Sequence, residues 1–106
     1  SEMKLKILES AIEDLHRGRE FYARHGEGVG EYFLDSLFSD IDSLLLYSGI
    51  HQKVFGYYRL LAKRFPYAVY YLIEEDVAVV YRVLDLRRNP AFLRDSLPSS
   101  DQPGQD

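Results

Sequence analysis

The stretch that decides the fold is residues 63–90, KRFPYAVYYLIEEDVAVVYRVLDLRRNP. It contains two runs of β-branched and aromatic residues, which predict strands over 65–74 and 77–86. The polar pair Glu75-Asp76 between the runs predicts an antiparallel hairpin, although the pair lacks the Gly of a tight primed turn. Residues 57–63 can form one further strand just upstream. Together these runs predict an antiparallel meander of three strands.

The chain before the meander shows first a strand pattern and then a helix pattern. Residues 3–8 alternate apolar and basic side chains, which predicts a strand with one buried face. Ser10 followed by Glu13 resembles a capping box, so we expect a helix from residue 11 to the glycines at 26 and 28. Its apolar positions recur at helical spacing. The chain therefore switches from strand to helix close to residue 10.

A second helix is predicted over about residues 30–47. Its apolar stripe consists of Phe33, Leu34, Leu37, Phe38, Ile41, Leu44 and Leu45. We expect the interspersed acids Asp35, Asp40 and Asp42 to face water. Two helices joined by a short Gly-containing loop predict a helical hairpin.

The element order predicts one α+β domain of two layers, with the helical hairpin on one face of the sheet. Asn89 as a cap and Pro90 at the first helical position predict a short helix over 90–96. We expect a single domain over 1–96. Residues 97–106 contain almost nothing apolar and are expected to be a disordered tail.

Composition narrows the function classes. The chain has 106 residues, 46% of them hydrophobic, and no cysteine, which excludes disulfides and thiolate metal sites. No apolar run is long enough to span a membrane and no signal peptide is visible, so we expect a cytoplasmic protein without membrane contact. We expect no cofactor and no metal, because His16, His25 and His51 are too dispersed for a shared site and are expected to be solvated.

Charge is distributed unevenly along the chain. The total is −4, yet residues 1–51 carry five Lys/Arg and ten Asp/Glu, whereas residues 52–96 carry eight and five. A basic half beside an acidic half permits an anionic partner on one face. Both predicted strands of the hairpin are also apolar on both sides, whereas two helices cover only one face of a sheet. The second face is covered either by a partner or by the short helix together with self-association.

The second half of the chain carries four features in a set order, namely Arg59, Phe65-Pro66-Tyr67, Val69 with Tyr71, and Arg87-Arg88-Asn89-Pro90. In this it resembles the RelE/ParE toxin superfamily, and more closely the ParE-like, plasmid-stabilisation branch. The first half fits the same pattern through Ala11, Asp14, Leu15, Tyr22, Phe33, Leu37 and Ile41, so the resemblance covers residues 3–96. One departure is Asp85, where many relatives carry His.

The resemblance implies the toxin component of a type II toxin–antitoxin system, neutralised when the C-terminal segment of a cognate antitoxin wraps around it. ParE-like members act against DNA gyrase, whereas RelE-like members cut messenger RNA on the ribosome. A degenerate member acting only as a protein-interaction domain is a third reading. A homodimer or a toxin–antitoxin hetero-oligomer would fit either toxin.

Cationic side chains are the candidate site residues. Messenger RNA cleavage would need cations and proton-transfer groups, for which the candidates are Arg59, Lys63, Arg64, Tyr81, Arg82, Arg87 and Arg88. Because no tyrosine follows Arg88 and the total charge is negative, we expect a binding protein rather than an enzyme. The expected partner-binding residues are Arg59, Tyr70, Arg82, Arg87 and Arg88.

Each arginine also has a purely structural reading. One member of the pair Arg87 and Arg88 can pair with Asp85 or Asp95 and fix the short helix in place. Arg59 can pair with a helix carboxylate. Arg82 lies on an otherwise apolar strand, so it is either at an exposed edge or buried with a partner, since an unpaired buried cation costs several kcal/mol.

Overall fold

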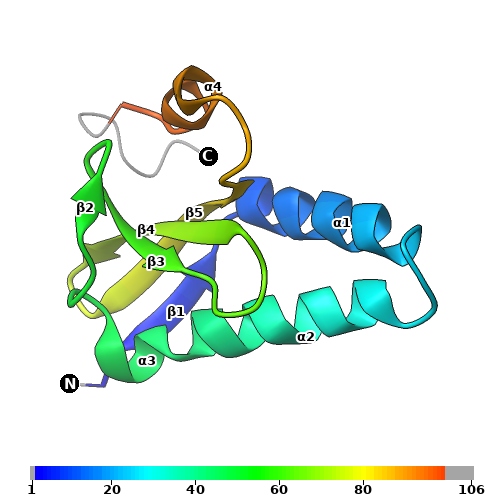
Figure 1. The fold of residues 1–106 in the computed structure, drawn as a ribbon. Helices are drawn as coiled ribbons and strands as arrows, with labels where there is room; N and C mark the ends of the chain where they lie inside the picture. The colour runs from blue at the N-terminus through cyan, green and yellow to red at the C-terminus, as the bar shows by residue number, and fades with distance from the viewer. Residues whose placement is uncertain (1, 100–106) are drawn as a thin grey trace.

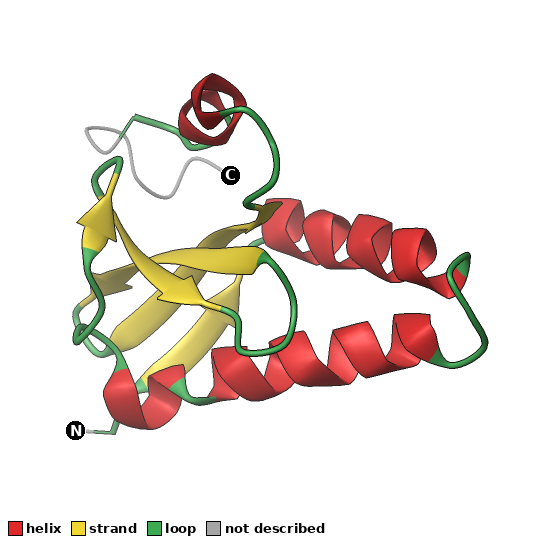
Figure 2. Cartoon of the chain, viewed as in Figure 1, coloured by secondary structure: helices red, strands yellow, loops and turns green. Residues whose placement is uncertain are grey.

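The structure is a computed structural model that describes residues 2–99. Its elements follow in the order β1 (Lys4–Ile7), α1 (Glu9–Ala23), α2 (Val29–Asp42), α3 (Leu44–Tyr47), β2 (Lys53–Val54), β3 (Tyr57–Leu61), β4 (Tyr67–Glu74), β5 (Val77–Asp85) and α4 (Pro90–Asp95). The predicted α+β class, the helical hairpin, the meander and the short last helix are confirmed (Figures 1 and 2). None of the helices within the described range is long and apolar enough to cross a membrane.

The sheet has five strands in the order β1-β5-β4-β3-β2 (Figure 1). β1 lies parallel to the first half of β5, and all other neighbours are antiparallel. β2 was not predicted, because two residues are too short to produce a period-two pattern. A bulge in β5 opposite Tyr70 and Tyr71 shifts the register with β4, so that Arg82 lies opposite Tyr70.

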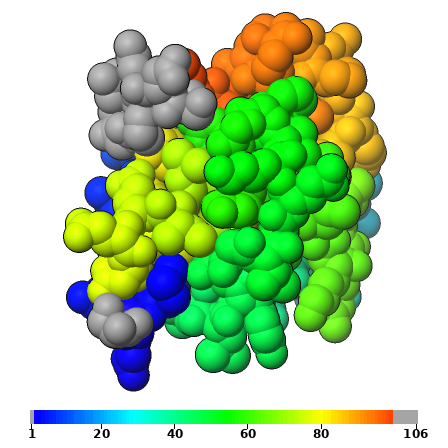
Figure 3. All heavy atoms as spheres, turned by 90° about the vertical axis from the view of Figure 1, so that its left-hand side faces the viewer, coloured from blue at the N-terminus to red at the C-terminus, as the bar shows by residue number. Residues whose placement is uncertain are grey.

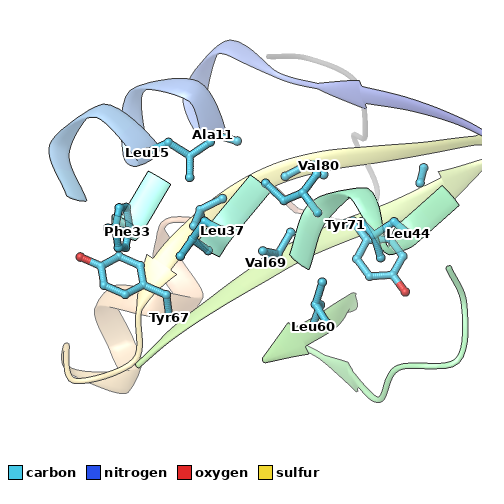
Figure 4. Packing of buried hydrophobic residues seen from close by; sticks show 13 residues of the cluster. Ala11, Leu15, Phe33, Leu37, Leu44, Leu60, Tyr67, Val69, Tyr71 and Val80 are labelled. Carbon is cyan, nitrogen blue, oxygen red and sulfur yellow. The ribbon is translucent and has the colours of Figure 1, made fainter. Parts of the chain in front are cut away.

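One face of the sheet packs against the helical hairpin. The buried residues that form this core come from α1, α2, α3 and strands β3 to β5 (Figure 4). Phe33 and Leu37 of α2 lie between the sheet and α1, and Gly18 lets α1 approach closely, because a Cβ there would sit 2.5 Å from the Phe33 ring. Of the predicted stripe on the second helix, Phe38 and Leu45 are instead exposed.

The second face is covered by the C-terminal part of the chain itself. Leu93 of α4 and the following Leu97 pack against residues of β3, β4 and β5, including Tyr70. The Tyr57 hydroxyl donates to the backbone oxygen of Pro98 at 2.7 Å, which fixes this segment on the sheet. Leu97 therefore lies in a core. This corrects the expectation of a disordered tail over 97–106 for its first residues, and residues 100–106 lie outside the described range.

Three local predictions are wrong. α1 begins at Glu9 with Leu8 as its N-cap, so the helix has no side-chain cap; Ser10 lies inside the first turn, and its hydroxyl donates to the backbone oxygen of Tyr81. The predicted second helix breaks after Asp42, where the Ser43 hydroxyl donates to the backbone oxygen of Asp40 at 2.6 Å. Asp40 is buried rather than facing water, and its Oδ2 accepts from the backbone N–H of Lys63 at 3.2 Å.

The cap of the last helix was predicted correctly. The Asn89 side chain accepts from the backbone N–H of Ala91 at 2.7 Å, and Pro90 occupies the first helical position. The β4–β5 turn also has the predicted residues, and Glu75 takes the left-handed conformation, with φ 57°, that Gly would otherwise supply.

Candidate functional site

The candidate site lies where β5 runs past the end of β1. β1 pairs only with Val77–Val80, so the second half of β5 lacks a neighbouring strand on that side. The first turns of α1 take the place of the missing strand. The Ser10 hydroxyl donates to the backbone oxygen of Tyr81 at 2.7 Å, and Asp14 Oδ2 accepts from the backbone N–H of Val83 at 2.9 Å. Two helix side chains thereby satisfy a strand edge that would otherwise be open.

Asp14 is the centre of this arrangement. Its side chain is only 4% exposed, and its two oxygens accept from Arg82 Nε at 2.7 Å and from Arg82 Nη2 at 2.8 Å. Arg17 Nη2 donates to the same carboxylate at 2.6 Å. The carboxylate is therefore fully engaged, as a buried charge must be to be tolerated.

Arg82 is a partly buried cation with a partner, which fits one of the two alternatives that the sequence left open. Besides the bonds to Asp14, its Nη1 donates to the backbone oxygen of Ser96 at 2.8 Å. A single guanidinium thus links β5, α1 and the end of α4. Since most of its donors are taken by the protein, Arg82 acts mainly as a positioning residue.

Arg87 and Asp85 form a second pair beside the first. Arg87 Nε and Nη2 donate to the two Asp85 oxygens at 2.9 and 2.7 Å, and the Arg87 backbone N–H also donates to Oδ1. Burial by itself would raise the pKa of Asp85, but these hydrogen bonds from Arg87 outweigh it and lower that pKa below its usual value. The Asp85 carboxylate therefore holds Arg87 in place and fixes the turn that follows β5.

Arg88 differs from its neighbours. Its guanidinium lies 3.8 Å from the centre of the Phe92 ring, a cation–π contact on α4. No carboxylate among residues 2–99 forms an ion pair with it, and the residue is exposed. Of the two arginines in the turn, Arg87 forms the ion pair that was expected for one of them, and Arg88 lies against the Phe92 ring.

These groups surround a cleft of about 320 Å³, which we call the arginine cleft. Its charged lining consists of Arg17, Arg82, Arg88, Asp14 and Asp85, and its aromatic lining of Phe21, Tyr67 and Phe92. Burial, followed by the charge of Asp85, raises the pKa of Tyr67 to about 12, so its hydroxyl stays protonated at neutral pH. The cleft combines three arginines and two carboxylates with aromatic walls, and the carboxylate of Asp14 already pairs with Arg17 and Arg82.

The remaining predicted site residues lie elsewhere. Arg59 of β3 is paired in register with Tyr70 of β4, on the sheet face that the C-terminal segment covers. Tyr70, which the sequence placed at a partner surface, has 0% exposure. Lys63 and Arg64 are exposed in the loop between β3 and β4. The structure thus brings Arg82, Arg87 and Arg88 together and separates them from Arg59 and Lys63.

His51 is not simply solvated, contrary to expectation. Its Nδ1 lies 2.5 Å from the hydroxyl of buried Tyr71, which also accepts from the backbone N–H of Gly49 at 2.8 Å. Desolvation lowers the pKa of His51, which favours the neutral ring near pH 7, and Nδ1 of that ring shares a hydrogen bond with the Tyr71 hydroxyl. Among the described residues there is no group of three His, Asp or Glu side chains that could hold a metal ion.

Asp14 was missed as a functional centre by sequence reasoning. The signal was nevertheless present, because Asp14 lies on the helix face that also carries the buried Ala11, Leu15 and Gly18. An acid on an apolar helix face must have partners, and an arginine on an apolar strand is its natural counterpart. Pairing Asp14 with Arg82 would have brought α1 to the edge of β5.

Comparison with known proteins identifies the family. A sequence profile described as "ParE toxin of type II toxin-antitoxin system, parDE" matches residues 5–90. A solved structure described as "Chromosomal ParDE TA system from P. aeruginosa" superposes with a TM-score of 0.72 at 18% identity, covering 79% of this chain and 96% of that one, and so shares the fold. No curated protein matches the sequence. Because the profile covers well over half of the chain and agrees with the resemblance seen in the sequence, the chain belongs to the ParE toxin family of type II toxin–antitoxin systems.

Proposed function

We propose that this toxin acts by binding a protein target, DNA gyrase, and that an acidic segment of its cognate antitoxin neutralises it by occupying the arginine cleft. The gyrase target rests on family membership. The observation that carries the antitoxin site is Arg88, an exposed cation without a carboxylate partner among residues 2–99, held above Phe92 at the rim of a cleft with apolar walls.

The geometry favours a binding protein over a ribonuclease. Transition-state stabilisation in RNA cleavage needs cations free to meet the phosphate, together with a group that can accept a proton near neutral pH. Arg82 and Arg87 are committed to Asp14 and Asp85, and Tyr67 has its pKa raised to about 12. Cleavage of messenger RNA therefore remains the second candidate, and the experiment below includes it as an outcome.

The test uses the full chain, expressed with and without the antitoxin encoded beside it. Expression alone is expected to arrest growth, to leave transcripts intact and to inhibit supercoiling by purified DNA gyrase. Growth arrest with transcripts cut at codons would show a ribosome-dependent nuclease instead. Normal growth with well-expressed folded protein would contradict a toxin function altogether.

The antitoxin site is tested by charge reversal. Arg88→Glu is expected to weaken the antitoxin at least about 10-fold, measured by calorimetry, because a rim cation that meets a carboxylate becomes a like charge. Growth arrest by the variant alone should be unchanged. The matched control is Arg94→Glu on helix α4, which follows the Arg88 turn, since Arg94 is exposed, pairs with Asp95 and does not line the cleft. Equal affinity of both variants would remove Arg88 from the antitoxin site.

A further inference from the structure

A second surface lies away from the arginine cleft, at residues 45–55. Ten large hydrophobic side chains are exposed among the described residues, and five of them fall within these eleven positions: Leu45, Leu46, Tyr47, Ile50 and Phe55. Leu46 is 80% exposed and Ile50 is 72% exposed, so neither contributes much to the core. We call this region the 45–55 surface. Exposed apolar groups gathered in this way mark interaction sites.

The 45–55 surface occupies one face of the molecule. Figure 3 shows α3, the β2–β3 hairpin and the β4–β5 turn side by side on that face. The contact is close, because a Cβ at Gly49 would lie 3.2 Å from Cδ1 of Ile73, next to the turn. β5 starts at Val77 beside this turn and ends at Asp85 in the arginine cleft. The two surfaces are therefore separated by the length of the longest strand.

Phe55 adds an independent observation. It has φ 57° and is followed by Gly56 with φ 85°, in a two-residue loop between Val54 and Tyr57. Such loops favour Asn-Gly, and a bulky residue in the left-handed region is strained. The Phe55 ring is also 40% exposed, so burial offsets this strain only in part. The hairpin holds an aromatic ring outward in a conformation that Asn would adopt more readily.

Charge around the 45–55 surface indicates what it can bind. Within it the only cation is Lys53, since His51 is held neutral by its lowered pKa, and the adjoining turn carries Glu74, Glu75 and Asp76. Exposed Lys4 of β1 also lies beside the turn, because its backbone N–H donates to the backbone oxygen of Asp76 at 2.7 Å. Two lysines against three carboxylates leave the rim weakly acidic. An acidic rim repels anionic lipid head groups and a second copy of the same surface, and it attracts a basic protein surface. Enzymes that act on nucleic acids present such basic surfaces.

We propose that the 45–55 surface docks the protein target of the toxin, and that the target receives Phe55, Ile50 and Leu46 in an apolar pocket with a basic rim. This docking role rests on the proposed function, because it assigns the target to one surface and the antitoxin to the other. Aromatic anchors that enter a pocket dominate binding energy at interfaces, which makes Phe55 the central contact.

Two variants and one control test the docking role in the full chain. The variants are Leu46→Ser with Ile50→Ser, and Phe55→Asn; the control is Ile12→Ser, an exposed apolar residue on α1. Growth arrest is measured as the inducer concentration that halves the growth rate, alongside antitoxin affinity and melting temperature. Each variant is expected to need at least about 10-fold more inducer, at equal protein level and with unchanged antitoxin affinity. The control should behave as wild type.

Phe55→Asn separates docking from folding. Because Asn tolerates the left-handed conformation, the melting temperature of this variant should stay level or rise while growth arrest weakens. A fall in melting temperature of more than about 5 °C would show instead that Phe55 serves packing, and would overturn its docking role.

The remaining outcomes are also decisive. Unchanged growth arrest by both variants overturns the docking proposal while leaving the proposed function intact. Loss of antitoxin affinity in parallel with growth arrest would assign the surface to the antitoxin. A wild-type dimer that becomes monomeric in the double variant, with unchanged arrest, would assign it to a second copy of this chain. If wild type fails to arrest growth, the proposed function fails and the docking role with it.

Discussion

The arginine cleft and the 45–55 surface are anchored to the same sheet by opposite kinds of chemistry. At the cleft, the buried carboxylate of Asp14 binds Arg17, Arg82 and the backbone of β5. At the 45–55 surface, the neutral hydroxyl of Tyr71 binds Gly49 and His51. The first site presents charges in fixed positions, whereas the second presents apolar side chains from α3, β2 and the turns beside them. The contrast predicts that substitutions at the two anchors differ in size and in their response to pH.

The largest effect is expected at Asp14. Asp14→Ala leaves Arg82 buried with its main partner removed and reopens the edge of β5, so the free energy of unfolding should fall by about 3–5 kcal/mol. Urea unfolding measures the loss. The control is Glu13→Ala, whose exposed neighbouring side chain should change stability by less than about 0.5 kcal/mol. A loss at Asp14 no larger than at Glu13 would show that the carboxylate does not hold the cleft together.

The same contrast explains what could be predicted from the sequence. Strands β4 and β5, their turn and the Asn89 cap depend on neighbouring residues, and each was predicted to within two positions. The capping box failed because α1 begins one residue before Ser10, whose hydroxyl donates to the backbone oxygen of Tyr81, 71 residues away. Such a competitor is invisible to any local pattern.

The candidate site was only partly predictable for the same reason. The Arg87-Arg88 turn is local, and one of its arginines was expected to pair with Asp85. The pair of Asp14 and Arg82 joins residues 68 positions apart and exists only because β1 stops short of the end of β5. Nothing local distinguishes Arg59, which lies in register with buried Tyr70, from Arg88, which lines the cleft.

The protein should lose less stability when the hydrogen bonds that hold the 45–55 surface are removed. Tyr71→Phe keeps the ring in the core but removes the hydroxyl that accepts from Gly49 and bonds His51. We expect a loss of about 0.5–1.5 kcal/mol, typical of one hydrogen bond, because Gly49 is exposed and water can reach its N–H. Tyr58→Phe is the control, because the Tyr58 ring stacks on the Tyr71 ring with the two centres 5.2 Å apart. Equal losses would show that the bonds from Tyr71 to Gly49 and His51 contribute nothing beyond the removal of a tyrosine hydroxyl.

The smallest effect is a pH dependence confined to the 45–55 surface. Desolvation lowers the pKa of His51 in the folded protein below its ordinary value of 6.5. Below that pH the unfolded chain binds more protons than the native chain, so the contribution of His51 is complete above about pH 6.5 and is lost as the pH falls. Denaturation midpoints measured between pH 7.5 and pH 5 should therefore decline less steeply in His51→Gln than in wild type, while exposed His16→Gln follows wild type. Protonation also places a charge on the partly buried ring that contacts the Tyr71 hydroxyl, so acid should loosen the 45–55 surface before it affects the arginine cleft, where the pKa of Asp85 is lowered. A toxin that lost antitoxin affinity before growth arrest on mild acidification would reverse that order and contradict the division of roles between the two surfaces.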